Sequence, residues 1–168
     1  MKKRIYVESS TISYLTSSPS RNLIIAAKQQ VTKDFWYLRN HFELFISQTV
    51  LDEIRCGNPQ AASLRIEAIE GIPILPRTDE VIQLTQILIQ NKGVPASEEQ
   101  DAAHIAHASV YGMYCLLSWN QKHIANQYQR RRVEEIILSY GMVPPLLMTP
   151  EELIWEIEKD EKTKMVSG

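Results

Sequence analysis

The clearest strand signal in the sequence is YCLLSW, residues 114–119. This run is apolar and aromatic, as expected of a strand that lies inside a sheet. Gly112 separates it from the preceding helical segment. A helix is expected on each side, at residues 97–110 and 123–140, because apolar residues recur there at helical spacing. A strand between two helices is the repeating unit of a parallel sheet.

The rest of the chain alternates in the same way. Further strands are expected at residues 5–7, 44–47, 72–75 and 146–148, with helices at 23–39, 49–55, 61–69, 78–90 and from 149 onward. The sequence therefore predicts an α/β fold, with a parallel twisted sheet of about four to five strands and helices on both faces. One domain over residues 1–158 suits this length, and the charged tail at 159–168 is expected to be flexible.

The composition limits the classes of function that this chain can have. Lys and Arg total 18 against 20 for Asp and Glu, so the formal net charge is -2. A protein that coats nucleic acid through overall charge is basic, and any RNA contact here must come from a local patch. No stretch approaches the roughly 18 apolar residues of a membrane-spanning helix. Glu8 interrupts the N-terminal apolar run too early for a signal peptide, and we expect a soluble, cytoplasmic protein.

Candidate site residues come directly after the strands, because ligands of open parallel sheets bind beyond the carboxyl ends of strands. Glu8 follows the first strand and precedes Ser9 and Ser10, while Ser118 and Asn120 end the segment around residues 114–119. Polar residues are common at strand ends because loops are solvated. These positions alone favour that simpler interpretation over a site.

Two further carboxylates sharpen the pattern. Asp101 lies about one turn into an expected helix, where it either complements the helix dipole or points as a ligand at the strand ends. Glu53 borders the apolar stripe of Val50 and Ile54, so it points either into a cleft or outward to solvent.

The ordered set of these segments resembles the motifs of PIN domains. The matching stretches are IYVESSTIS at residues 5–13, SQTVLDEI at 47–54, DAAHIAHA at 101–108 and LLSWN at 116–120. TPEEL at 149–153 is similar to the C-terminal ending of one bacterial branch of the family. The resemblance covers almost the whole chain and implies a three-layer PIN-like fold of the VapC-toxin type.

That resemblance also implies an activity, that of a metal-dependent endoribonuclease hydrolysing RNA phosphodiesters as the toxin of a type II toxin–antitoxin pair. It assigns the catalytic positions to Glu8, Glu53, Asp101 and Asn120. Glu8, Asp101 and Asn120 would ligate Mg²⁺ or Mn²⁺, hard ions that suit oxygen ligands, with Glu53 a ligand or a water-positioning base. Ser10 and Ser118 would hydrogen-bond to the ligands. The implied partners are RNA, a cognate antitoxin and a second copy in a homodimer.

Two positions depart from the family pattern. Glu8 stands where Asp is usual, and its extra methylene moves the carboxylate by roughly an ångström. Asn120 also stands where Asp is usual, which removes one formal charge from the site. These departures motivate an alternative, a catalytically weakened PIN-like module that binds RNA or a protein partner. A phospho-receiver domain would need paired acids after the first strand and a strand-end Lys, which the sequence lacks.

Basic and imidazole side chains supply the remaining candidates. His123, Lys122 and Arg130 are possible contacts for RNA phosphates. Arg130 also has Glu134 at helical pairing distance, so a solvated, salt-bridged face is an equal interpretation. His104 lies one turn after Asp101, where a packing role is favoured over one in orienting a ligand.

Overall fold

The computed structural model describes residues 1–120 and 127–168, and its centre is a parallel sheet of five strands. The strands lie in the order β3-β2-β1-β4-β5, and every neighbouring pair is parallel. They are β1 (Lys3–Val7), β2 (Phe42–Ser47), β3 (Ile74–Leu75), β4 (Cys115–Leu117) and β5 (Leu146–Met148). The predicted α/β class and strand number are confirmed.

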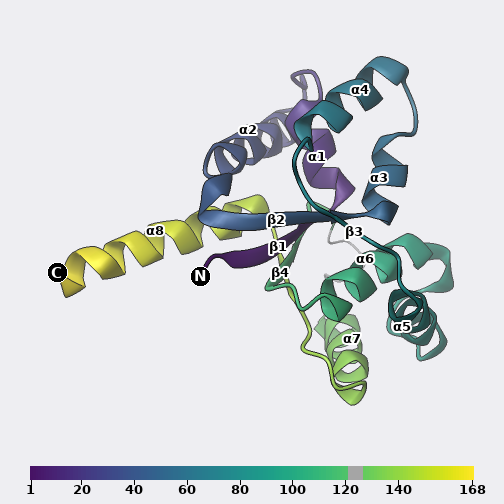
Figure 1. Ribbon diagram of the computed structural model, residues 1–168. Helices are drawn as coiled ribbons and strands as arrows, with labels where there is room; N and C mark the ends of the chain where they lie inside the picture. The colour runs from purple at the N-terminus through teal and green to yellow at the C-terminus, as the bar shows by residue number, and fades with distance from the viewer. Residues whose placement is uncertain (121–126) are drawn as a thin grey trace.

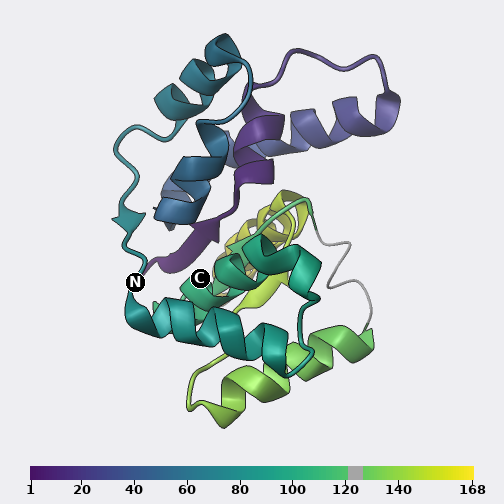
Figure 2. The ribbon, with the colours of Figure 1, turned by 90° about the vertical axis from the view of Figure 1, so that its right-hand side faces the viewer.

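Helices cover both faces of this sheet and make a three-layer, PIN-like arrangement (Figure 1). One layer holds α1 (Ser9–Thr16), α2 (Leu23–Tyr37), α3 (Gln48–Ile54) and α4 (Pro59–Ala68). The other holds α5 (Asp79–Gln90), α6 (Glu99–Val110) and α7 (Gln127–Ser139). The last helix, α8 (Pro150–Ser167), packs against α2 and extends beyond the sheet, while Figure 2 shows the two layers from the side.

The strand order reverses between β1 and β4. From β1 the chain builds outward to β2 and β3 through α1 to α4, then returns through α5 and α6 to place β4 on the other side of β1. A crevice opens at such a reversal because the flanking connections leave in opposite directions. Glu8 and Ser118, the residues that follow β1 and β4, lie at this point, and the Glu8 N–H donates to Leu117 O at 3.0 Å.

The two central strands are buried on both sides. Ile5, Tyr6 and Val7 of β1 are each 0% exposed, and all three residues of β4 are buried. Strands covered by helices on both faces must be apolar at successive positions, which is why YCLLSW shows no alternation. The small residues Ala102 and Ala106 let α6 lie close to this sheet.

Local details differ from the predictions at two places, and a third prediction falls partly outside the described residues. Helix α1 was not expected, since its serine-rich sequence shows little helical patterning. A capping box at Ser97 was expected to begin the helix, but a 3-10 turn at Ala96–Glu98 precedes α6, which begins at Glu99. Residues 123–126 of the helix expected at 123–140 lie outside the described residues.

The C-terminal segment is helical in the structure. Helix α8 continues through residues 159–167, all of them exposed, and the flexibility expected there stays a prediction. Within the described parts of the chain, no helix is both long and apolar enough to cross a membrane.

Candidate metal centre

Glu8 is a carboxylate held in place at the end of β1. Glu8 is only 6% exposed, and it occupies the N-cap position of α1. Ser9 Oγ donates to Oε1 at 2.8 Å, and Ser118 Oγ donates to Oε2 at 2.7 Å. Ser10 Oγ also donates to Oε2. Three hydroxyl donors to one buried carboxylate fix its position.

The backbone orients two of these serines. Trp119 N–H donates to Ser10 Oγ at 3.0 Å, and Asn120 N–H donates to Ser118 Oγ at 2.9 Å. Because each Oγ already accepts from the backbone, its own hydrogen is left to point at Glu8. The turn after β4 therefore sets the Glu8 side chain, which lies 110 residues away from Ser118 in the sequence.

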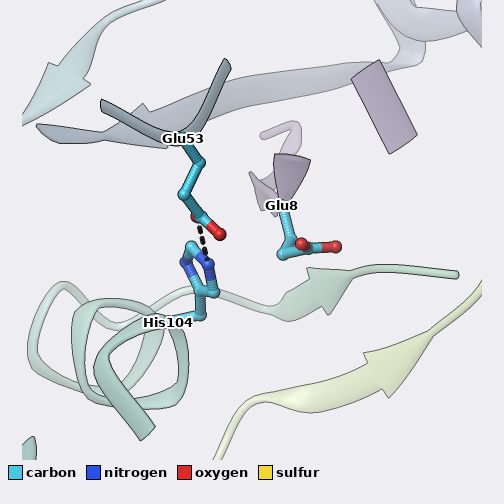
Figure 3. A group of neighbouring side chains, drawn as sticks. All are labelled: Glu8, Glu53 and His104. Atoms are coloured by element: carbon cyan, nitrogen blue, oxygen red, sulfur yellow. Dashed lines mark ion pairs between the residues drawn. The ribbon is translucent and has the colours of Figure 1, made fainter. Parts of the chain in front are cut away.

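Glu53 from α3 and His104 from α6 complete a cluster with Glu8 (Figure 3). One ligand atom from each of the three residues lies within 4.8 Å of the others. His104 Nε2 and Glu53 Oε1 are 2.6 Å apart. This contact joins the imidazole ring to the carboxylate, and through it Glu53 acts on the pKa of His104.

Tyr6 anchors the other side of the His104 ring. Its hydroxyl lies 2.7 Å from His104 Nδ1 and 2.7 Å from Ser47 Oγ, with all three groups buried. Burial raises the pKa of the Tyr6 phenol well above 10.0, partly opposed by the hydrogen bond to Ser47. Tyr6 is therefore neutral near pH 7 and keeps its proton for this hydrogen-bond chain.

The two histidines of α6 have opposite pKa shifts. Burial disfavours charge on His104, but the hydrogen bond and charge of Glu53, with the charges of Glu8 and Asp101, outweigh it and raise its pKa above 6.5. Burial, with the nearby charges of His104 and Arg77, lowers the pKa of His107 to about 4. The imidazole beside the carboxylates is stabilised as a cation, and the one a turn later is neutral.

The chemistry of this cluster fits a cation. Two carboxylates converge in a largely buried place, and none of the ion pairs recorded among the described residues joins Glu8 or Glu53 to a Lys or Arg. Carboxylate oxygens select hard divalent ions such as Mg²⁺ and Mn²⁺.

The structure brings together part of the set that the sequence predicts. Glu8, Ser10 and Ser118 meet directly, and Glu53 points into the cluster rather than out to solvent. Asp101 is half-buried one turn before His104, and its charge acts on the pKa of that ring.

The other predicted residues lie farther out or outside the described parts. Asn120 is exposed and lies three residues after the end of β4. Arg130 pairs with Glu134 at 3.9 Å and donates to Leu147 O, as the salt-bridged interpretation predicts. Lys122 and His123 lie outside the described residues.

Sequence reasoning underrated His104 and missed Tyr6. The signal for His104 was present, since it lies three residues after Asp101 and shares its helical face. Tyr6 carries no such signal, because an aromatic residue within an apolar strand is indistinguishable from ordinary core.

A groove leads away from the cluster on the Glu53 side. It is a cavity of about 460 Å³ lined by Thr49, Asp52, Glu53, Cys56, Arg77 and Gln100. Arg77 follows β3 and is exposed, so a positive charge and a carboxylate of the cluster face the same hollow.

Fold and cluster together define a class, the PIN-like α/β proteins with acidic residues at the strand switch point. Solved structures similar to this chain include the two that follow. VapC20 of Mycobacterium tuberculosis, described as a sarcin–ricin loop cleaving toxin, has a TM-score of 0.55 at 18% identity, covering 72% of this chain and 93% of its own. A chain of VapBC2 from Rickettsia felis, solved bound to a DNA fragment from their promoter, has a TM-score of 0.56 at 13% identity, covering 87% of this chain and 98% of its own.

These likenesses confirm the PIN-like fold that the sequence motifs predicted. No family model matches the sequence, and no curated protein matches it. The identities are too low to carry residue roles from one chain to the other.

Proposed function

We propose that this chain is a metal-dependent endoribonuclease that hydrolyses RNA phosphodiesters as the toxin of a type II toxin–antitoxin pair. The observation that carries the proposal is the convergence of Glu8 and Glu53 with His104 at the switch point of a PIN-like sheet. The similar VapC20, described as cleaving the sarcin–ricin loop, supports RNA as the substrate.

Glu8 and Glu53 would hold Mg²⁺ or Mn²⁺, with Asp101 and Asn120 as the further ligands expected from the sequence. Such an ion supplies Lewis acidity that activates water and offsets negative charge on the leaving oxygen. The longer arm of Glu8 is compatible with this task because Ser9, Ser10 and Ser118 restrain its carboxylate.

The alternative role for Glu53, in place of metal ligation, is that of a proton acceptor. Its side chain is 22% exposed, so one carboxylate faces both the cluster and the solvent-filled groove. A water molecule entering by the groove would hydrogen-bond to Glu53, which would orient it toward the phosphodiester and take its proton.

The groove provides a local positive charge that a chain of net charge -2 needs for binding RNA. Arg77 lines it together with Glu53 and would contact a phosphate flanking the bond to be cut. Arg77 thereby joins Arg130, Lys122 and His123 as a candidate phosphate contact.

Partners are proposed on separate grounds. The similar VapBC2 structure supports an antitoxin partner for this chain. Leu23 and Ile24 of α2 are 85% and 70% exposed, and this apolar surface would be covered by the antitoxin or by a second copy in a homodimer. The activity and its inhibition would both take place in the cytoplasm.

The test is cleavage of a structured RNA by the purified chain with Mn²⁺ or Mg²⁺. We expect cleavage that EDTA abolishes and that Asp101→Asn reduces by at least about 100-fold. Asp79→Asn is the matched control, because Asp79 is also an acid in the first turn of a helix but lies on α5. Equal cleavage by the native chain and Asp101→Asn would contradict the proposal.

The second candidate is a catalytically weakened module that binds RNA or a protein. The exposed position of Asn120 and the Glu at position 8 favour it. It predicts RNA binding without cleavage, and cleavage gained in Glu8→Asp. A native chain that turns over RNA repeatedly excludes it.

A further inference from the structure

We propose that His104 is a positioning residue, which holds one oxygen of Glu53 so that the other stays directed at the metal centre. The inference rests on the proposed function, since it concerns the same site. It adds two residues, Tyr6 and His104, to which the family motifs assign no role.

The contacts form a closed circuit through four elements, β1, β2, α3 and α6. Ser47 accepts from Val50 N–H at 3.2 Å and thereby caps α3, the helix that carries Glu53. Tyr6 Oη of β1 lies 2.7 Å from that same Ser47 Oγ and 2.7 Å from His104 Nδ1. His104 Nε2 of α6 reaches Glu53 Oε1 at 2.6 Å. Glu53 is thus held at its backbone and at its carboxylate by one connected set of groups.

Burial makes this circuit rigid. Tyr6 is 0% exposed and His104 is 2% exposed, and their ring centroids are 5.8 Å apart. Neither ring can turn without leaving a polar atom unsatisfied in the core. A buried phenol and a buried imidazole are costly choices for packing alone, since apolar residues of similar size would fill the space.

Glu53 requires such a restraint more than Glu8 does. Three serines hold Glu8, whereas Glu53 is partly exposed and repelled by the nearby Glu8 charge. In Figure 3 His104 meets one oxygen of Glu53, and the other oxygen points to the side of Glu8. Without the imidazole, the flexible Glu53 side chain would turn toward the groove.

The chain offers a matched control on the same helix. His107 lies one turn after His104, is 0% exposed and also stacks on Tyr6, with ring centroids 6.2 Å apart. Its recorded hydrogen bond goes to Thr49 Oγ1, at 3.4 Å, and not to a carboxylate. A general loss of packing would affect both histidines, but a loss of positioning would affect only His104.

The experiment measures Mn²⁺ affinity by titration calorimetry in the native chain, His104→Gln, Tyr6→Phe and His107→Gln, with thermal unfolding of each metal-free protein. We expect His104→Gln to weaken Mn²⁺ binding by about 10- to 100-fold, the usual effect of removing a group that orients a ligand. Tyr6→Phe keeps the ring and removes only the hydroxyl, so a smaller loss in the same direction is expected. His107→Gln should bind Mn²⁺ as the native chain does.

Spin-echo spectroscopy of the Mn²⁺-loaded native chain distinguishes positioning from direct ligation. A positioning residue predicts no ¹⁴N modulation from a coordinated imidazole, whereas modulation that disappears in His104→Gln would overturn the inference. Native-like Mn²⁺ affinity in both His104→Gln and Tyr6→Phe would also overturn it. If His104→Gln does not fold, Tyr6→Phe decides alone. A native chain that binds no Mn²⁺ would instead refute the proposed function, and this inference with it.

Discussion

The two ends of the parallel sheet both carry a polar cluster, but only one of them is compensated in charge. At the amino end Lys3 Nζ pairs with Glu156 Oε2 at 2.9 Å, and Tyr114 Oη donates to Glu156 Oε1 at 2.6 Å. At the carboxyl end Glu8 and Glu53 lie close together, and the imidazole of His104 contacts Glu53. The first cluster is partly exposed, and the second is largely buried.

Charge compensation therefore distinguishes a structural cluster from a candidate site. Lys3 and Glu156 at the amino end compensate each other in charge, so this pair requires no bound ion. At the carboxyl end the buried Glu8 lies close to Glu53, and this surplus negative charge costs free energy unless a cation is bound. Cavity size does not identify the candidate site. The hollow beside Lys3 and Glu156 is about 520 Å³, and the groove beside Glu53 is smaller, about 460 Å³.

The largest effect is expected from Glu8→Gln. The amide has the same shape but removes a charge that the metal requires, and its NH₂ group meets serine donors. We expect RNA cleavage to fall by roughly 1000-fold, the upper range for losing one charge-stabilising group. Gel assays with Mn²⁺ measure it, and cleavage within a few-fold of the native rate would show that the surplus charge has no function.

The pH dependence of the unfolding free energy tests whether burial keeps His107 neutral. The pKa of His107 is about 4 against 6.5 in the unfolded chain, because burial excludes its cation. The unfolded chain therefore binds more protons between these values, and His107 makes stability fall as pH drops from 6.5 to 4. The cost by pH 4 is at most roughly 3 kcal/mol.

The difference in unfolding free energy between native chain and His107→Gln isolates this contribution, since other groups titrate in both. Urea unfolding at pH 7 and pH 4.5 should show Gln gaining relative to His at the lower pH. If the difference between the two proteins did not change with pH, His107 would take up a proton as readily in the folded chain as in the unfolded one. Burial would then not keep this histidine neutral.

Ser118→Ala sharpens the comparison within the carboxyl end. It removes one of the three donors to Glu8, and we expect about a 10-fold loss of Mn²⁺ affinity. Ser109→Ala is the matched control, because this buried serine donates within α6 to Ile105 O and contacts no carboxylate. Equal effects of the two substitutions would show that Ser118 acts through general packing.

The fold followed from the sequence where short apolar runs were bounded by turn residues and helical segments. Strand β5 was predicted at its observed bounds, and YCLLSW identified the central β4. Helix α1 was missed because its stability comes from packing of Ile12 and Thr11 on the sheet, not from its own propensity.

The candidate site was predictable at its strand ends and less so in its interior. Glu8, Ser10 and Ser118 follow strands, and topology alone brings them together. His104 and Tyr6 join them through register, since a rotation of α6 by one residue would direct a different side chain at Glu53. That rotation is set by close packing of Ala102 and Ala106, which no linear pattern specifies.

The smallest effect is expected at the compensated end, from Glu156→Gln. The hydrogen bond to Glu156 raises the pKa of Lys3, a group whose side chain is 39% exposed, so solvent screens the pair. We expect a loss of at most about 1 kcal/mol in unfolding free energy at pH 7 and unchanged RNA cleavage. Because the folded pKa is raised, this contribution is present below pH 10.5 and is lost as pH rises through the folded value. Urea unfolding at pH 7 and above pH 10.5 tests this, and a loss of cleavage in Glu156→Gln would show that the two ends of the sheet are coupled rather than independent.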